Sequence, residues 1–272
     1  MSILIDQIGV EHLFNTFPSR IVSLVPSQTE LLFDLGLEQN IVGITKFCVH
    51  PKHFLKSKTI VGGTKAVHFD KIKALNPDII IANKEENTAE MVVELRKICT
   101  VWVTNVVNIS DNLQMISDFG LLFGKQAEAQ KWVQKIKFAH ADFEQFMKVE
   151  MFKKVAYFIW AKPFMVAANN TFINEMLGLN KFQNIFQDLN RYPEIEIVQL
   201  EVKLPDYIFL SSEPYPFKDK HKVALQQFTK AQIILVDGEY FSWHGSRILE
   251  AFDYFKKLHQ NAAFFNNNVA TK

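Results

Sequence analysis

The chain has 272 residues, of which 48% are hydrophobic and 22% charged, and its formal net charge is +1. These values are ordinary for a globular protein of one large or two small domains. A charge so close to zero gives no electrostatic basis for binding nucleic acid or a membrane surface. Two cysteines, Cys48 and Cys99, are too few for a disulfide framework.

The N-terminus lacks the marks of a secretory signal. No Lys or Arg precedes Arg20, and polar residues interrupt the apolar ones between Asp6 and Asn15. No stretch reaches about 18 uninterrupted apolar residues, so no transmembrane helix is expected. The sequence as written therefore predicts a cytoplasmic protein, or a periplasmic one if a leader has been trimmed from it.

The first half alternates short buried-strand patterns with helices. A β-type lead-in over residues 1–19 precedes strands predicted at residues 20–25, 41–45, 59–61, 79–82 and 101–104. Helices are predicted at residues 27–36, 69–75, 88–98 and 111–123. Ser27 and Glu30 have the spacing of a capping box for the first of these helices.

A long helix is predicted over residues 125–150, which contain no Gly or Pro. Its apolar residues recur every three or four positions, as on one helix face: Trp132, Ile136, Ala139, Phe143 and Phe146. The helix would span about 39 Å at 1.5 Å per residue. We expect it to connect two α/β lobes.

The strand–helix alternation resumes after this helix, with strands predicted at residues 154–160, 165–168, 206–211 and 231–236. Asn170 or Thr171 is expected to cap one helix and Ser246 to cap the last. A weak repeat relates LNPDIII, at residues 75–81, to LPDYIFL, at residues 204–210. The expected fold is α/β, with two Rossmann-like lobes of mainly parallel strands bridged by one long helix. The expected domains are residues 1–123, 124–150 and 151–272.

Ligands of open α/β sheets bind beyond the carboxyl ends of the strands, and the loops predicted there contain many aromatic and charged side chains. This pattern suits a sizeable planar or macrocyclic ligand held by aromatic walls and a few polar groups. The predicted ligand-binding residues are Lys46, His50, Lys65, Lys84, Glu85, Trp160, Glu213, Tyr215, Trp243, His244 and Arg247.

Some of these residues have a plainer interpretation. Cys48 and His50 could bind a metal, but their spacing is not a standard zinc spacing, and Cys is often a small core residue. No metal site is therefore predicted. His244 could be an axial ligand or a donor to the ligand, or a surface histidine that helps to cap the last helix.

Arg247 lies in the first turn of the last predicted helix, where the helix dipole disfavours a cation. It therefore needs a specific partner, either a carboxylate or phosphate of the ligand or an internal Asp or Glu. Glu85 could accept hydrogen bonds from the ligand, or it could simply be solvated. The sequence shows no convincing catalytic constellation.

Several motifs together resemble the cobalamin- and ferric-siderophore-binding proteins of ABC importers, the helical-backbone metal receptors. The N-terminal motifs are RIVSLVPSQTE at residues 20–30, VG at 42–43, HP at 50–51, VGGTK at 61–65 and KI to NPDIII at 71–81. EYFSWHGSR, at residues 239–247, resembles a motif near the end of the second lobe. The resemblance implies two lobes on a backbone helix, with the ligand between them and little hinge motion.

The resemblance also implies a partner. In the cobalamin binder, an acidic residue on each lobe docks onto arginines of the permease. The corresponding positions here are Asp70 and the neighbourhood of Val198, where Glu196 is the candidate. A tryptophan that packs on the corrin ring in that family corresponds to Thr64.

The resulting hypothesis is non-catalytic binding of a metal chelate by a monomer that delivers it to an ABC permease or acts as a related carrier. Cobalamin or another corrinoid is favoured as the bound ligand, ahead of a ferric siderophore or haem. One alternative is a cytoplasmic enzyme with His244 as acid/base and Arg247 as anion clamp. Another is a small-molecule sensor that uses the same cleft.

Overall fold

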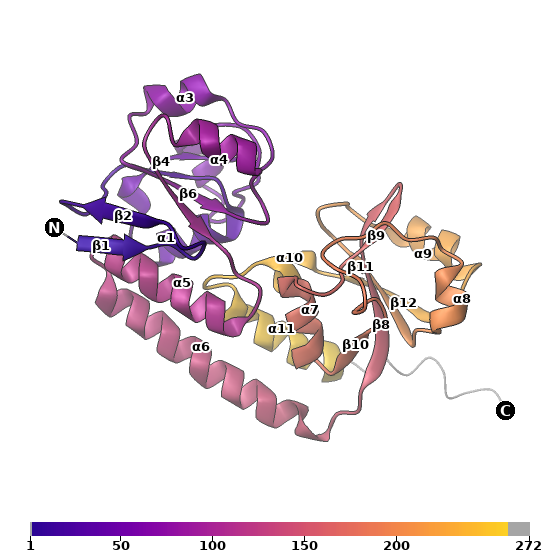
Figure 1. Cartoon of the computed structure of the whole chain (residues 1–272). Helices are drawn as coiled ribbons and strands as arrows, with labels where there is room; N and C mark the ends of the chain where they lie inside the picture. The colour runs from indigo at the N-terminus through magenta and orange to yellow at the C-terminus, as the bar shows by residue number, and fades with distance from the viewer. Residues whose placement is uncertain (1, 261–272) are drawn as a thin grey trace. The chain divides into compact units, whose positions relative to one another are not determined.

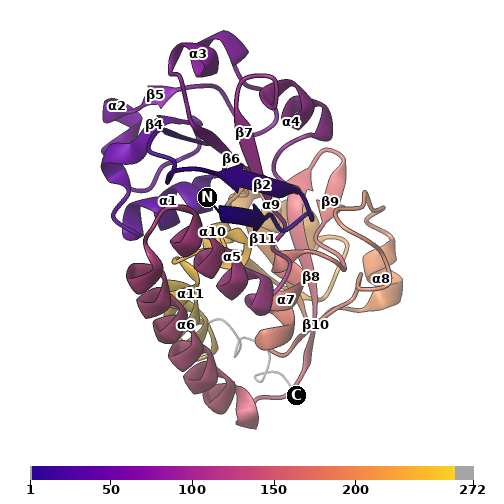
Figure 2. The same ribbon diagram turned by 60° about the vertical axis from the view of Figure 1, so that its left-hand side comes forward.

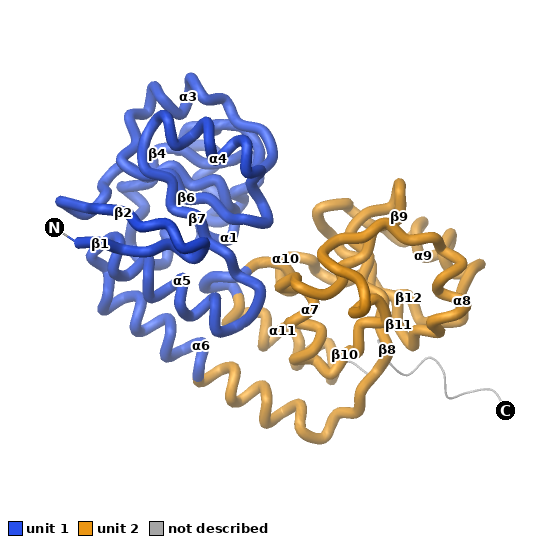
Figure 3. Tube along the Cα trace, viewed as in Figure 1, with its two compact units in different colours: residues 1–137, 244–247 blue, residues 138–243, 248–272 orange. Residues whose placement is uncertain are grey.

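The chain forms two compact units, each built around its own five-stranded sheet (Figures 1 and 3). The structure is a computed structural model that describes residues 2–260. Of these, residues 2–137 and 244–247 form the first unit, and residues 138–243 and 248–260 form the second. The domain boundaries expected at residues 123 and 150 stay a prediction.

The strands of the first unit are β1 (Ser2–Ile5), β2 (Glu11–Phe14), β3 (Ile21–Ser23), β4 (Ile41–Ile44), β5 (Thr59–Ile60), β6 (Ile79–Asn83) and β7 (Thr100–Thr104). Its helices are α1 (Pro26–Asp34), the 3-10 turn η1 (Glu38–Asn40), α2 (Phe54–Ser57), α3 (Phe69–Ala74), α4 (Ala89–Leu95) and α5 (Ile109–Leu122). The five strands predicted between residues 20 and 104 are confirmed, with bounds that differ by at most two residues.

The five-stranded sheet of the first unit is entirely parallel, in the order β5-β4-β3-β6-β7. Its central strands are buried on both faces, as the run Ile79, Ile80 and Ile81 shows, because helices cover both sides. Ile72 of α3 and Leu95 of α4 pack against one face. Figures 1 and 2 show α5 on the other side. The carboxyl ends of all five strands therefore meet at one edge.

The predicted β-type lead-in is a separate antiparallel hairpin of β1 and β2. The buried carboxylate of Asp6 accepts hydrogen bonds from the backbone N–H of Val103, at 3.2 Å, and of Val10, at 2.9 Å. His12 Nε2 lies 3.1 Å from the same carboxylate. Because β7 is an edge strand, these contacts attach the hairpin to the part of the sheet that would otherwise be open.

The predicted long helix is α6 (Gln126–Phe146), followed by the 3-10 turn η2 (Met147–Val149). Its first half belongs to the first unit, where Trp132 Nε1 donates to the carbonyl of Asp34 at 3.3 Å. Its second half belongs to the second unit, where the ring of Phe143 packs 5.4 Å from that of Phe252. Ile136 and Phe143 are fully buried, as the helical period predicts.

The strands of the second unit are β8 (Lys153–Ala161), β9 (Phe164–Val166), β10 (Phe182–Asn184), β11 (Tyr207–Ser211) and β12 (Gln232–Val236). Its helices are α7 (Phe172–Leu179), α8 (Gln199–Lys203), α9 (Asp219–Gln226), α10 (Gly238–Ser242) and α11 (Ile248–Gln260). Thr171 caps α7 as expected, since its hydroxyl accepts from Asn174 N at 3.1 Å. The sequence did not predict β10, α8, α9 or α10.

The second sheet has parallel strands in the order β10-β8-β11-β12, with β9 antiparallel to β8. Successive side chains of β8 point to opposite faces. Phe158 packs in a core that includes Leu200 of α8, whereas the ring of Tyr157 lies 5.1 Å from that of Phe241 on α10. Figure 1 shows the corresponding layers, with α8 and α9 on one side of the sheet and α7 and α11 on the other.

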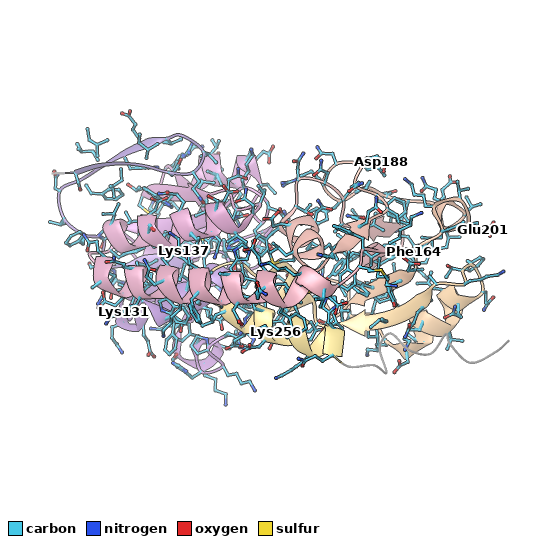
Figure 4. All side chains as sticks on the ribbon, turned by 90° about the horizontal axis from the view of Figure 1, so that it is seen from below. Lys131, Lys137, Phe164, Asp188, Glu201 and Lys256 are labelled. Atoms are coloured by element: carbon cyan, nitrogen blue, oxygen red, sulfur yellow. The ribbon has the colours of Figure 1, made fainter. Side chains whose placement is uncertain are left out.

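Helix α11 is also tied to the second half of α6. Lys256 of α11 forms an ion pair with the carboxylate of Asp142, and Figure 4 shows Lys256 beside α6. No helix in the part of the chain that the structure describes has the length and hydropathy needed to cross a membrane.

The repeat around the Pro-Asp turns is present in the structure. Asp78 N–H donates to the carbonyl of Arg20 at 2.9 Å, and Asp206 N–H donates to the carbonyl of Lys154 at 2.9 Å. Each carboxylate also accepts a hydrogen bond from the backbone at the start of the neighbouring strand. Asp78 accepts from Arg20 N at 2.9 Å, and Asp206 accepts from Lys154 N at 2.7 Å. Each turn thus aligns the start of one strand, β6 or β11, with that of its parallel neighbour, β3 or β8.

Candidate functional site

Three loops meet at the carboxyl edge of the first sheet, following β4, β5 and β6. Lys46 N–H donates to the carbonyl of Gly62 at 2.9 Å, which joins the first two loops. Asn87 Nδ2 donates to the carbonyl of Thr64 at 2.8 Å, and Lys65 Nζ to that of Glu85 at 2.6 Å. The structure therefore brings together the predicted site residues Lys46, Lys65, Lys84 and Glu85 at one edge.

An exposed aromatic ring, which the sequence analysis did not single out, lies among these loops. Phe47 is 48% exposed, and the ammonium group of Lys46 lies 5.0 Å from its ring centroid. A Cβ atom added to Gly63 would come within 3.2 Å of the Phe47 ring. Gly63 therefore leaves room for this ring, which offers a flat apolar surface next to a cation.

Buried side chains of α1, β6 and β7 form hydrogen bonds with one another and with the loop after β6. Gln28 Nε2 and Asn83 Nδ2 both donate to Thr104 Oγ1, at 2.5 and 3.0 Å. Asn83 Oδ1 accepts from Glu85 N at 2.8 Å and thereby shapes the loop after β6. The Oε1 atom of Gln28 is buried with no hydrogen-bond partner in the structure.

Cys48 is a core residue. Its thiol lies 3.1 Å from Thr29 Oγ1 and 3.2 Å from Thr45 Oγ1, and burial raises its pKa. His50 is half-buried and has an interaction partner. Within residues 2–260, no group of three or more His, Cys, Asp or Glu side chains is arranged to hold a metal ion.

Residues 244–247, which we call the HGSR segment, belong to the first unit although they follow a strand and a helix of the second. The guanidinium of Arg247 donates to the Glu30 carboxylate through Nε at 2.8 Å and through Nη2 at 2.5 Å. The two side chains are 8% and 15% exposed. Of the two kinds of partner expected for Arg247, the structure shows the internal carboxylate.

This ion pair corrects the capping box predicted for Ser27 and Glu30. Helix α1 begins at Pro26 and its N-cap residue, Val25, makes no side-chain cap. Pro is favourable in the first helical position because it has no N–H to satisfy. Ser27 therefore lies inside the first turn, and Glu30 binds a residue 217 positions away.

The rest of the HGSR segment is also fixed by contacts within the first unit. Gly245 N–H donates to Asn112 Oδ1 at 2.5 Å, with a backbone φ of 93° that favours glycine. Ser27 Oγ lies 3.4 Å from Nδ1 of His244, which is buried. Burial lowers the pKa of this imidazole to about 4 because it disfavours the cation. His244 is therefore not the surface histidine that was one alternative.

The predicted cap at Ser246 is wrong. Its Oγ atom is buried and has no hydrogen-bond partner in the structure. Helix α11 begins two residues later, at Ile248. The side chain is held in the interior because its neighbours on both sides are anchored to the first unit.

Aromatic side chains lie together at the carboxyl edge of the second sheet. Trp160, near the end of β8, is 38% exposed, and its ring lies 5.4 Å from that of Tyr215 in a T-shaped contact. The Tyr215 hydroxyl is 3.2 Å from His221 Nε2 on α9. This pair offers a partly exposed aromatic surface, and its part in ligand binding stays a prediction.

The half-buried Glu213 and the buried Trp243, also predicted, form a hydrogen-bonded pair in the same unit. The Glu213 carboxylate accepts from Trp243 Nε1 at 2.8 Å and from Ser242 Oγ at 2.7 Å. Burial raises the pKa of Glu213, against the lowering effect of the Ser242 hydrogen bond. Gly238 packs directly against the Glu213 side chain, since a Cβ atom at this position would be 2.7 Å from Glu213 Cγ. Because Trp243 is only 6% exposed, these contacts mainly fix its position.

Asp70 and Glu196, the candidates for docking to a permease, are both exposed. Asp70 lies in the first turn of α3, in the first unit, and Glu196 precedes α8, in the second. Docking by these residues stays a prediction.

A pocket of about 260 Å³ lies elsewhere in the second unit, near the start of β8. It contains none of the predicted site residues. Its lining residues are Lys154, Gln183, Asn184, Ile185, Gln187, Asp188 and Lys203.

Comparison with known proteins gives consistent matches. A family model described as periplasmic binding protein matches residues 21–233. The vitamin B12-binding protein of Vibrio cholerae serotype O1 is 28% identical over 203 residues, which cover 72% of this chain and 71% of that protein. An uncharacterised ABC transporter substrate-binding lipoprotein of Bacillus subtilis is 27% identical over 179 residues, covering 63% of this chain and 56% of the lipoprotein.

Among solved structures, the periplasmic vitamin B12 binding protein of Vibrio cholerae superposes with a TM-score of 0.78 at 22% identity. The superposition covers 90% of this chain and 98% of that one. It confirms the predicted α/β fold with parallel sheets and a long helix.

Proposed function

Because this chain belongs to the periplasmic binding protein family, we propose that it binds a metal chelate and passes it on without changing it chemically. The cargo belongs to the class that includes corrinoids, haem and ferric siderophores. The observation that carries this proposal is the family match over residues 21–233, together with the vitamin B12-binding relative at 28% identity.

The side chains at the carboxyl edges suit such a cargo. Trp160 and Tyr215 offer aromatic surface in the second unit, and Phe47 offers it in the first. A planar macrocycle has large apolar faces that stack on such rings. The location of the ligand between the two lobes, expected from the sequence, stays a prediction.

A binding role also agrees with how the titratable groups are engaged. Glu30 pairs with Arg247, and Glu213 accepts from Trp243. His244 is buried, so the acid/base role considered for it lacks access to solvent-borne substrate. The two residues that the enzyme alternative would use, His244 and Arg247, instead contact Ser27 and Glu30 of the first unit.

The experiment is a titration of the purified chain with cyanocobalamin, haemin and a ferric tricatecholate, followed by absorbance and tryptophan fluorescence. We expect one of the three to bind with 1:1 stoichiometry and to be recovered unchanged by mass spectrometry. Failure of all three to bind would refute the proposal. Chemical conversion of the bound chelate would favour the alternative hypothesis that the protein is an enzyme.

Trp160→Ala should weaken binding of that chelate by about three- to tenfold, the loss expected for one aromatic contact. Phe152→Ala is the matched control. Phe152 is 69% exposed and immediately precedes β8, so it lies at the opposite end of the strand from Trp160. Equal effects of the two variants would argue against a ligand at the carboxyl edge.

Delivery to an ABC permease is the expected next step, because the Bacillus subtilis relative is named as an ABC transporter substrate-binding lipoprotein. Asp70→Lys and Glu196→Lys variants that bind the chelate normally but no longer support its uptake by cells would identify the docking residues. Fractionation of cells that make the native protein tests whether it meets a permease outside the cytoplasmic membrane or acts inside the cell.

A further inference from the structure

The link between α6 and β8 presents apolar side chains to solvent. Val149 is 85% exposed, Met151 74% and Phe152 69%. The three lie close together between the end of α6 and the first residue of β8 (Figure 1). Single exposed apolar residues are common on globular proteins, but three in so short a stretch indicate a contact surface. We call residues 149–152 the apolar tip.

Hydrogen bonds fix the backbone of the apolar tip. Glu150 N–H donates to the carbonyl of Met147 at 3.2 Å, and Lys153 N–H donates to that of Lys181 at 3.0 Å. The ammonium of Lys181 donates to the carbonyl of Glu150 at 3.1 Å and lies 5.8 Å from the centroid of the Phe152 ring. The tip is therefore tied to the segment before β10, and a fixed turn of the chain exposes its apolar side chains.

Lysines border the apolar tip. Lys148 precedes it, Lys153 and Lys154 follow it, and all three side chains are exposed. Lys181 immediately precedes β10, the strand that pairs with β8. The tip itself contains one carboxylate, that of the half-buried Glu150. The whole chain has a net charge of only +1, but this local excess of cations attracts an anionic surface.

The pocket of about 260 Å³ adjoins this border, because Lys154 is one of its lining residues. Lys203 also lines it, and its ammonium lies 3.2 Å from Asp188 Oδ1. The Asp206 carboxylate accepts from the backbone N–H of Lys154, at 2.7 Å. Within residues 2–260, no carboxylate forms an ion pair with the ammonium of Lys154. The pocket therefore has a cation available for an anionic group.

We propose that the apolar tip, with Lys148, Lys153 and Lys154, binds the surface of a membrane that contains anionic phospholipids. The apolar side chains enter the boundary between headgroups and acyl chains, and the lysines pair with lipid phosphates. The pocket beside Lys154 accommodates one phosphate headgroup. The surface is separate from the candidate site residues Trp160 and Tyr215, because it lies at the amino end of β8 and they lie at the carboxyl edge.

A second copy of the chain is a less suitable partner than a lipid surface. In a two-fold contact the same surface is used on both sides, so the lysines around one apolar tip would approach those around the other. Like charges at such a contact repel. An anionic bilayer satisfies the apolar and the cationic groups together.

The experiment is flotation of the full chain with vesicles of phosphatidylcholine alone and of phosphatidylcholine mixed with phosphatidylglycerol. We expect the chain to float with the mixed vesicles at low salt, and to float much less with them at high salt, where the charges are screened. It should not float with phosphatidylcholine alone. Absence of flotation with the mixed vesicles at low salt would overturn the proposal, as would equal flotation with both kinds of vesicle.

A double variant tests the apolar part of the surface. Met151→Ser combined with Phe152→Ser should weaken binding to the mixed vesicles by at least about tenfold, because two apolar side chains no longer enter the bilayer. Phe138→Ser is the matched control and should bind as the wild type. Phe138 is 79% exposed and lies about two turns before the end of α6.

Single variants test the lysines. Lys153→Gln and Lys154→Gln should each weaken binding by about three- to fivefold, the effect expected for one lysine near an anionic surface. Lys153→Arg and Lys154→Arg keep the charge and should stay within about twofold of the wild type. Lys220→Gln is the control, because Lys220 is exposed in the first turn of α9, outside the apolar tip and its border.

Other results would assign the surface to another partner and overturn the proposal. A dimer in sedimentation that the double Ser variant dissociates would indicate a second copy of the chain. Binding of inorganic phosphate that depends on Lys154, without flotation, would indicate a site for free phosphate. Titrations of the double Ser variant with cyanocobalamin and haemin should match those of the wild type. A loss of chelate binding there would mean that the tip is not separate from the cargo site.

Discussion

His244 is 6% exposed in the HGSR segment, and burial lowers the pKa of its imidazole to about 4. An unfolded histidine titrates near 6.5. Between these values the unfolded chain binds a proton that the folded chain does not. The free energy of unfolding should therefore fall as the pH drops from about 6.5 to about 4, by up to about 3 kcal/mol from this residue.

The measurement is urea unfolding at pH 7 and pH 4.5 for the wild type, His244→Asn and His53→Asn. His53 is the control because its side chain is 52% exposed. We expect the stability of His244→Asn to fall less steeply than that of the wild type on acidification. His259, whose pKa burial also lowers to about 4, should leave a residual dependence of the same sign in all three proteins. Identical pH slopes in wild type and His244→Asn would contradict the assignment.

Single residues also show where sequence reasoning about the site stops. The types and loops of Lys46, Lys65 and Trp160 could be predicted, because the carboxyl ends of parallel strands meet at one edge. The pairing of Glu30 with Arg247 could not, since a local pattern at residues 27–30 suggested a cap and the true partner is 217 positions away. Phe47 was missed because nothing in the local sequence distinguishes an exposed phenylalanine from the many buried ones; its exposed fraction of 48% is visible only in the structure.

At the scale of elements, the Pro-Asp turns set the register between parallel strands. Asp78 accepts three hydrogen bonds, from Ser19 N, Ser19 Oγ and Arg20 N, at 2.8 to 2.9 Å. Asp206 accepts one that the structure shows, from Lys154 N. Burial raises the pKa of Asp78, but these hydrogen bonds outweigh it and hold the pKa below its usual value.

Asp78→Ala should therefore lower the free energy of unfolding by about 2 kcal/mol, and Asp206→Ala by about 1 kcal/mol, since each carboxylate orients backbone donors at the start of a strand. Urea unfolding at pH 7 measures both. Asp219→Ala, at a side chain that is 87% exposed, is the control and should change stability by less than about 0.5 kcal/mol. Equal losses in the free energy of unfolding for Asp78→Ala and Asp206→Ala would contradict the expectation that the loss grows with the number of hydrogen bonds that the carboxylate accepts.

The strands and helices that could be predicted are those long enough for their buried residues to form a recognisable hydrophobic pattern in the sequence. Strand β6 is a run of buried apolar residues, and the 21 residues of α6 hold several helical periods. Strand β10 and helix α8 have three and five residues, too few for a period to show. The start of α11 was misplaced because Ser246 fits the pattern of a cap, whereas contacts of the HGSR segment bury it.

At the scale of the whole molecule, the path of the chain links the two units. It passes from one to the other within α6, between Lys137 and Phe138, and again on either side of the HGSR segment. Because a helix is hydrogen-bonded continuously along its axis, order in one half of α6 supports order in the other. Unfolding of the two units should then be coupled through this helix.

Lys137→Pro tests the coupling. Lys137 is exposed, so the substitution removes no buried side chain, but proline deletes a helical hydrogen bond and clashes with the preceding turn, at a cost of about 3 kcal/mol. Hydrogen exchange at increasing urea, followed by mass spectrometry, reports separately on β6 in the first unit and β11 in the second. In the wild type both strands should lose protection at the same urea concentration, whereas in Lys137→Pro one should lose it earlier. Lys137→Ala keeps the helix and should behave as the wild type. Coincident loss of protection in Lys137→Pro would mean that the continuity of α6 is not what couples the units.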